Sequence, residues 1–285
     1  METPRLPLKE TANVNNWVAR IERAEELSLK YPFAAEILLF YKQVASFQRG
    51  FDARLRANRD LMARIRGVTP LREQLNLDAL LPELPAFLDL VSKAAPAPLA
   101  AHAGQPAASG IDAQPQWEDI LKTYWENGGR FETELDDLQT FCAQAFLQPY
   151  AELIVAHREV PPPVARRMAC PLCAGAPHLG VMRPEGDAAK RLLQCSFCAT
   201  EWDFTRIVCP ACGEEDEKKV CFYSANGFEH IRVEACDSCK TYLLSVDLTK
   251  NGRAVPVVDE IAAVPLNLWA RESGYSKLHP NLMGM

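Results

Sequence analysis

The chain has 285 residues, 48% hydrophobic and 24% charged, a composition that excludes wholesale disorder and predicts about two domains. Its formal charge of -6 disfavours a general nucleic-acid binder. No apolar run approaches the ~20 residues needed to cross a bilayer, so we expect no membrane span. The first ten residues, METPRLPLKE, lack the pattern of a secretory signal, and we therefore expect a cytoplasmic protein.

Helical periodicity dominates the first half of the chain. The apolar stripe Val14–Ile21 predicts a first helix, with Thr11 or Asn13 as its N-cap. A second helix is expected to begin near Pro32, which suits a first turn, and to end at Gly50.

More helices are expected along residues 55–65, 77–91, 117–124 and 131–157. The second of these contains Pro82 and Pro85, so we expect it to be broken or kinked. Strand patterns are nearly absent here, which predicts an all-α bundle over residues 1–160. An Ala/Pro/Gly-rich stretch at 95–115 reads as a loop within this bundle, and Pro161–Pro163 reads as a spacer after it.

Short strand patterns follow the proline spacer. They cover residues 192–193, 201–204, 220–223 and 231–235. A last helix is expected at 258–272, interrupted at Pro265. The predicted fold class is therefore α+β, with an N-terminal helical bundle, two tandem small zinc-ribbon-like β modules and a C-terminal helix. The predicted units are residues 1–160, 161–206, 207–250 and 251–285.

Ten cysteines are the unusual feature of the composition, and eight of them form four C-x-x-C pairs. The pairs are Cys170/Cys173, Cys195/Cys198, Cys209/Cys212 and Cys236/Cys239. Each half of this set reads C-P-x-C, then 21 or 23 residues, then C-x-x-C, with the second copy 39 to 41 residues after the first. The region is therefore a duplicated module.

The pairs favour four-thiolate metal sites over disulfides or redox centres. A reducing compartment keeps thiols free, and clustered thiols at this spacing are typical metal ligands. One ion per module, two in all, is expected. Pairing within each repeat is favoured over a cross-brace that joins the first pair to the third. Gly213 suits the left-handed turn after Cys212, whereas Ala174 makes the first turn less ideal. Four thiolates suit zinc or a single iron, so the residues leave the metal open.

The remaining candidates favour ordinary structural roles. Cys142 and Cys221 are expected to be core thiols. The five histidines show no zinc-motif spacing, and no catalytic constellation is visible, so we expect no enzyme activity. Residues 160–250 hold 11 Lys+Arg against 12 Asp+Glu, which disfavours a nucleic-acid-binding ribbon.

The two modules and the tail after them resemble a known family. The tail reads Asp259-Glu-Ile-Ala-Ala-Val-Pro265-Leu-Asn-Leu-Trp269-Ala, followed by Gly274-Tyr275. With the four cysteine pairs it resembles the formate dehydrogenase accessory protein (FdhE) family, closely over 168–275 and more loosely in the helical part, for example at Pro32–Tyr41. The Ala/Pro insertion at 95–115 departs from the family.

The resemblance implies a cytoplasmic assembly factor that contacts the catalytic subunit of formate dehydrogenase before its export. It also implies rubredoxin-like modules that favour iron over zinc at the eight paired cysteines. The client surface is expected on the helical bundle, with the Trp269 tail. Alternatives are a rubredoxin-type electron carrier or oxidoreductase and a nucleic-acid-binding zinc-ribbon protein. A homodimer is left open.

Overall fold

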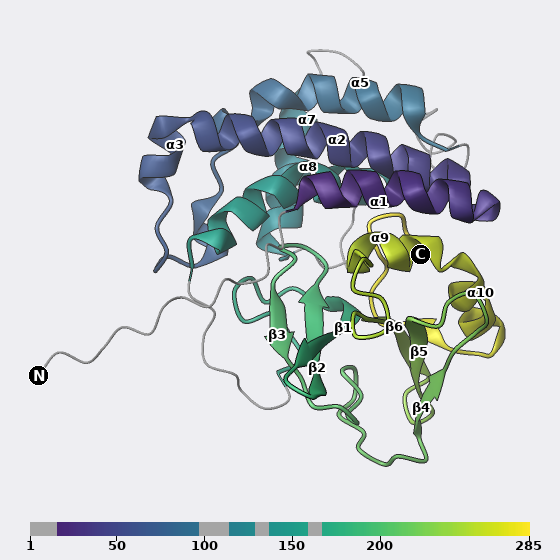
Figure 1. Cartoon of the computed structure of the whole chain (residues 1–285). Coiled ribbons are helices and arrows are strands. Elements are labelled where there is room, and N and C mark those ends of the chain that lie inside the picture. The colour runs from purple at the N-terminus through teal and green to yellow at the C-terminus, as the bar shows by residue number, and fades with distance from the viewer. Residues whose placement is uncertain (1–15, 97–113, 129–136, 159–166) are drawn as a thin grey trace, which may run out of the picture.

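The computed structural model describes residues 16–96, 114–128, 137–158 and 167–285. An N-terminal helical layer covers a mixed sheet that is followed by two C-terminal helices (Figure 1). The α+β fold class predicted from the sequence is confirmed. Thr11, Asn13, the proline spacer, most of the 95–115 stretch and the start of the helix expected at 131 lie outside the described residues.

Seven α-helices, with short 3-10 turns between some of them, make up most of the described helical layer. They are α1 (Trp17–Lys30), α2 (Ala35–Ala57), α3 (Arg59–Arg64), α4 (Leu77–Leu80), α5 (Leu84–Ala94), α7 (Gln114–Glu126) and α8 (Asp137–Ala156). The expected break in the 77–91 helix is confirmed, because a 3-10 turn that contains Pro82 separates α4 from α5.

The expected end of the second helix at Gly50 is wrong. Helix α2 continues through Gly50 to Ala57. A glycine inside a helix costs only about 1 kcal/mol, and the turns after it bury Phe51 and Leu55, whose burial outweighs that cost. The helix expected to include residue 55 therefore starts later, as α3.

The expected cap of the first helix is wrong, and its expected apolar stripe holds at the buried Trp17 but not at Val18. Asn16 caps α1, since its side chain accepts a hydrogen bond from the amide of Ala19 at 3.0 Å. Val18, placed on the apolar stripe, is exposed, whereas Arg20 and Arg23 are buried. Both arginines have buried carboxylate partners, so the buried face of α1 is partly ionic.

Seven strands form one sheet in the order β3-β2-β1-β6-β5-β4, with β7 paired to β6. They are β1 (Pro177–Glu185), β2 (Ala188–Cys195), β3 (Glu201–Asp203), β4 (Val220–Tyr223), β5 (Ile231–Cys236), β6 (Thr241–Asp247) and β7 (Ser276–Lys277). Each module contributes three antiparallel strands, and the parallel pair β1–β6 joins the modules. The two modules therefore share one sheet. The four units predicted from the sequence stay predictions.

A buried carboxylate fastens the two modules across this joint. Glu234 on β5 accepts hydrogen bonds from Arg191 on β2 and from Arg232 at 2.7 Å. These two arginines occupy equivalent positions in the duplicated sequence. Burial raises the pKa of Glu234, but the two guanidinium groups outweigh that effect and lower it below its usual range.

The C-terminal helices fasten the sheet to the helical layer. The interruption expected at Pro265 is confirmed, because α9 (Pro256–Ala262) and α10 (Val264–Glu272) are separate helices. Asp259 on α9 accepts hydrogen bonds from Arg23 of α1 at 2.9 Å and lies 2.8 Å from His230, in the turn directly before β5. One carboxylate therefore joins three parts of the fold.

Candidate metal centres

The eight paired cysteines gather into two groups of four. One group contains Cys170, Cys173, Cys195 and Cys198, and the other contains Cys209, Cys212, Cys236 and Cys239. In each group the sulfur atoms lie within 4.8 Å of one another. The thiols therefore meet within each repeat, as the favoured pairing predicts, and not across the two repeats.

The sulfur spacing fits a tetrahedral ion. Metal–sulfur bonds of about 2.3 Å place tetrahedral sulfurs about 3.8 Å apart. In the first group Cys173 lies 3.3 Å from Cys195 and 3.5 Å from Cys198. In the second, Cys212 lies 3.7 Å from Cys236. Disulfide sulfurs are about 2.05 Å apart, and all these cysteines are free. Each group could hold one metal ion, and that the eight residues are ligands stays a prediction.

The same backbone turn follows all four C-x-x-C pairs. The residue after each second cysteine has a positive φ: Ala174 (61°), Ala199 (54°), Gly213 (79°) and Lys240 (55°). The expected left-handed glycine is thus only one of four. The turn directs a backbone amide at sulfur, as where the amide of Gly175 donates to Cys173 Sγ at 3.3 Å. Such donors stabilise a thiolate.

Gly175 in the first module is needed for space and not for its φ angle. A Cβ atom at this position would lie 3.1 Å from Cys195 Sγ and 3.2 Å from Cys173 Sγ. It would also lie 2.9 Å from the carbonyl oxygen of Gly128. The first thiol group is therefore enclosed by backbone.

The first group lies inside the main hydrophobic core of the helical layer. Its four cysteines are at most 4% exposed. Phe197, between Cys195 and Cys198, is fully buried and meets the edges of Tyr124 and Trp125 at 5.5 and 5.3 Å between ring centroids. Aromatic contacts of this kind add stability beyond area burial. Helix α7 thus closes one side of the first group.

The thiols of the first group have divergent pKa values. Burial raises the pKa of Cys195 and of Cys198 well above the ordinary range. Burial also acts on Cys170, but hydrogen bonds from the other three thiols outweigh it and lower the pKa of Cys170. A metal ion would have to displace protons from the group on binding, so its affinity should rise with pH.

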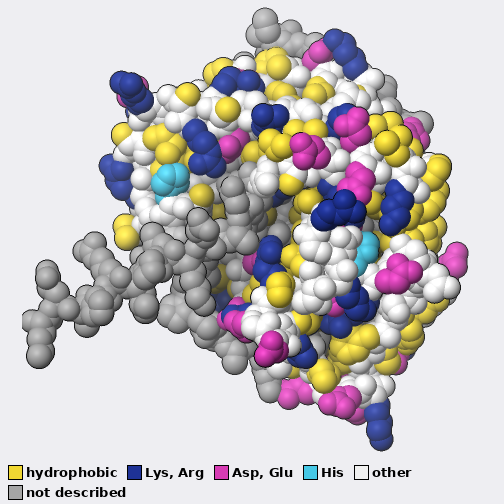
Figure 2. Space-filling view, viewed as in Figure 1, with side chains coloured by type: hydrophobic (Ala, Val, Ile, Leu, Met, Phe, Trp, Pro, Cys, Tyr) yellow, Lys and Arg dark blue, Asp and Glu magenta, His cyan; other side chains and the backbone are white. Residues whose placement is uncertain are grey.

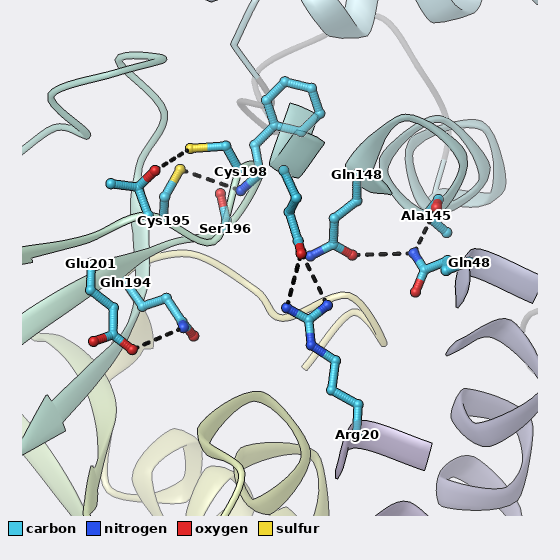
Figure 3. A network of polar contacts seen from close by, with 12 residues as sticks. Arg20, Gln48, Ala145, Gln148, Gln194, Cys195, Ser196, Cys198 and Glu201 are labelled. Atoms are coloured by element: carbon cyan, nitrogen blue, oxygen red, sulfur yellow. Dashed lines mark hydrogen bonds and ion pairs between the residues drawn. The ribbon is translucent and has the colours of Figure 1, made fainter. Parts of the chain in front are cut away.

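A row of buried polar side chains follows one face of helix α8, and Figure 3 shows one of them, Gln148, bonded to Gln48 of α2. Helix α8 supplies Gln144, Gln148 and Glu152, which lie four residues apart on one face. Gln144 donates to the backbone carbonyl of Ser196, between Cys195 and Cys198, at 3.0 Å. At the other end Glu152 accepts from Arg20 of α1 at 3.0 Å. Helix α8 therefore makes polar contacts with both the cysteine turn and α1.

The second group lies at the surface. Cys212 is exposed and Cys239 is half-buried, although Cys209 and Cys236 are buried. The apolar cluster around it is small, with Val220 as the buried residue besides these two cysteines. Ser238, which occupies the position equivalent to Phe197, donates to Glu214 at 2.5 Å instead of packing in a core.

Other residues considered in the sequence differ in outcome. Cys142 is buried, as expected, whereas Cys221 is only half-buried and is not a core thiol. His178 and His230 are buried, and burial lowers the pKa of His178 to about 3. Phe197 escaped the sequence reasoning. An aromatic residue inside a C-x-x-C pair, against serine in the duplicate, was the available signal for a buried centre.

Family models identify the region that holds both groups. The model described as FdhE, central domain matches residues 169–206, and the one described as FdhE, C-terminal domain matches residues 207–283. Residues 169–283 therefore belong to the FdhE family. The resemblance expected from the sequence is confirmed, and the family region contains all eight paired cysteines.

Named FdhE homologues support this assignment. The chain is 30% identical over 166 residues to an FdhE homologue of Aquifex aeolicus, which covers 58% of this chain and 57% of that protein. It is 34% identical over 127 residues to an FdhE homologue of Pseudomonas aeruginosa, covering 41% and 40%. The matched segments thus span about half the length of these relatives or less.

The fold as a whole is shared with a solved FdhE structure. The crystal structure of the FdhE protein from Pseudomonas aeruginosa superposes with a TM-score of 0.65 at 24% identity. The alignment covers 95% of this chain and 96% of that one. The helical layer, which lies outside both family matches, therefore has the FdhE fold as well.

Proposed function

We propose that this chain is a cytoplasmic accessory factor for the maturation of formate dehydrogenase, and that it binds the catalytic subunit before export without catalysing a reaction. The observation that supports this most is the pair of four-thiol groups within an FdhE family region. Closed four-thiolate sites leave no position for a substrate or water, which suits structure or electron transfer better than hydrolysis.

The residues present fit two tetrahedral thiophilic ions. Cys170, Cys173, Cys195 and Cys198 would hold one, and Cys209, Cys212, Cys236 and Cys239 the other. When bound, iron would supply one-electron redox chemistry and zinc a purely structural centre, and the family resemblance favours iron. The cysteines would draw the two turns of each module together, which would contribute folding energy on the order of 10–16 kcal/mol for a structural site.

The client surface would include the C-terminal helix α10. Leu268 and Trp269 there are 52% and 38% exposed. Trp269 packs against Tyr223 at 4.6 Å between ring centroids. Exposed aromatic residues that are held rigidly are frequent anchors at protein interfaces. A homodimer belongs to the same proposal, and light scattering of the full chain tests it.

Co-purification with the catalytic subunit of formate dehydrogenase tests the main proposal. We expect the intact protein, prepared without oxygen, to retain the subunit, and a Leu268→Asp/Trp269→Ala variant to retain less of it. Met168→Asp, at an apolar residue that is 38% exposed and lies outside both the helical layer and α10, is the matched control and separates a surface effect from general loss of hydrophobicity. Failure of the intact protein to bind the subunit would contradict the proposal.

A second candidate is a rubredoxin-type electron carrier or oxidoreductase, which the surface position of the second group favours. An exposed Cys212 would bring an iron ion close to a redox partner. Elemental analysis with a visible spectrum separates the candidates, since a colourless zinc protein could not carry electrons. The nucleic-acid alternative has less support, because basic and acidic side chains alternate over the face in Figure 2.

We found that none of the described helices combines the length and apolar character needed to span a membrane. This finding is compatible with the cytoplasmic location in the proposal. Fractionation of cells that produce the tagged full chain tests the location, and recovery in the periplasm would contradict it.

A further inference from the structure

The two thiol groups differ in their access to solvent. All four sulfurs of the first group are buried, whereas Cys212 is exposed and Cys239 half-buried in the second. Exchange of a bound ion in a four-thiolate site needs an incoming ligand to approach the ion as one thiolate leaves. Only the second group offers an edge where this can occur in the folded chain.

The surroundings make the difference large. An incoming ligand could reach Cys195 only after Phe197 left its contacts with Tyr124 and Trp125, which belong to the main core. That opening resembles unfolding of the layer. The second group lies among a few apolar residues and polar surface turns, so local motion is enough to expose it.

The polar surface beside Cys212 fits an exchange edge. Glu214 lies two residues after Cys212, and its carboxylate accepts hydrogen bonds from Ser238 at 2.5 Å and from the amide of Asp216 at 3.0 Å. These contacts fix the loop that carries Cys212 to the turn that carries Cys239. Breaking them would release Cys212 without moving the sheet.

We propose that the second group is an exchange site for its thiophilic ion, with Cys212 as the leaving ligand, while the first group keeps its ion for the life of the fold. This rests on the proposed occupancy of both groups. A thiol from a small molecule or a partner protein forms one metal–sulfur bond as the Cys212 bond breaks. Its proton passes to the Cys212 thiolate, so neither an oxidant nor a reductant is needed.

Ion release from the full chain tests the proposal. Protein prepared without oxygen is first shown by elemental analysis to hold two ions, and is then exposed to EDTA with glutathione. We expect one ion to leave roughly 100-fold faster than the other, because one release needs local and the other near-global opening. Far-UV circular dichroism should stay unchanged while the faster of the two ions leaves.

Mass spectrometry then assigns the released ion. Iodoacetamide added after the first release should label Cys209, Cys212, Cys236 and Cys239 and spare Cys170, Cys173, Cys195 and Cys198. Labelling of the first group before the second, or loss of both ions at one rate, would overturn the proposal. A chain that holds no ions at all would instead contradict the proposed occupancy, before any exchange is measured.

Variants locate the exchange edge. Cys212→Ser should lower retention to one ion per chain without unfolding the protein. Cys221→Ser, at the half-buried cysteine of β4 outside both groups, is the matched control and should keep two ions. Glu214→Gln, which weakens the loop contacts but keeps all ligands, should speed the fast release and leave the slow one unchanged. A Glu214→Gln variant that speeds the slow release instead would count against the assignment.

Discussion

The two thiol groups come from one duplicated sequence pattern yet occupy opposite environments. The first lies within the core that holds the helical layer together, and the second lies at the surface with a small apolar cluster of its own. Their turns are alike, with a left-handed residue after every second cysteine. The local chemistry of the duplicated unit has thus been kept while its surroundings have diverged.

This difference teaches that identical ligand sets need not have identical roles. Where Phe197 lies in one copy the other has Ser238, and each residue is matched to its surroundings: aromatic rings in the first case, a carboxylate in the second. We therefore expect the first group to contribute to global stability and the second to be largely independent of it. The following predictions test that division.

Loss of one cysteine should have the largest effect, and it should differ between the groups. Cys195→Ser removes a ligand from the buried group and should cost a large part of the ~10–16 kcal/mol that a structural site supplies. We expect an aggregated or molten chain. Cys236→Ser, its duplicate, should give a folded helical layer with a lower metal content. Thermal unfolding followed by near-UV circular dichroism, with elemental analysis, measures both; equal destabilisation would contradict the division.

Truncation of Phe197 should have the next largest effect. Phe197→Ala empties a fully buried site between two aromatic rings and should lower the free energy of unfolding by about 3–5 kcal/mol. Ser238→Ala at the duplicate position removes one exposed hydrogen bond and should cost about 1 kcal/mol or less. Urea unfolding of both variants gives the two values. If Phe197→Ala lowered the free energy of unfolding by less than Ser238→Ala does, the aromatic contacts would not be formed.

The stability of the protein should also depend on pH through the buried His178. Burial, with the nearby His279 and Lys277, lowers the pKa of His178 to about 3, against about 6.5 in an unfolded chain. The unfolded state therefore binds the extra proton first. Stability is complete above about pH 6.5 and is lost as the pH falls towards 3, by at most about 1.4 kcal/mol per pH unit. Urea midpoints from pH 7 to 5 should fall less steeply in His178→Gln than in the wild type.

The left-handed turns should give the smallest effects. A non-glycine residue at positive φ costs about 1–2 kcal/mol, and the extra freedom of glycine in the unfolded chain offsets roughly 0.4–1 of that. Ala174→Gly and Lys240→Gly should therefore stabilise the protein slightly, by less than about 1 kcal/mol. Gly213→Ala should destabilise it by a similar amount. Thermal midpoints compared at one ion content measure these shifts, and a stabilised Gly213→Ala would contradict the assigned φ.

Much of the fold follows from local patterns, and the exceptions have physical reasons. The strands at 220–223 and 231–235 were predicted closely, because the first is rich in β-branched and aromatic residues and in the second Ile231 and Val233 alternate with charged residues. The central pair β1–β6 was missed. Strand β1 contains Pro177, Gly180 and Pro184, which locally indicate a break, and its pairing with β6 is a contact between distant residues that no local period records.

The candidate centres were predicted better than their environments. Spacing predicted that these eight cysteines gather into two groups of four, since a tetrahedral site would constrain neighbouring thiols directly. Burial of Arg20 and Arg23 could not be predicted, because charged residues are buried only where partners such as Glu152 and Asp259 arrive from distant segments. The same reason hid the burial of the first centre, which depends on α7 and α8.

The order of the strands has one more consequence. The last strand of the second module, β6, lies beside the first strand of the first module, β1, so the copies associate head to tail. Such an arrangement does not close on itself. In the duplicated pattern β3 corresponds to β6 and β4 corresponds to β1, yet β3 and β4 lie at the two free edges of the sheet. Successive molecules could in principle extend the sheet into a filament. These edges contain only three and four residues, and edge strands that short offer another chain too few backbone groups for stable addition.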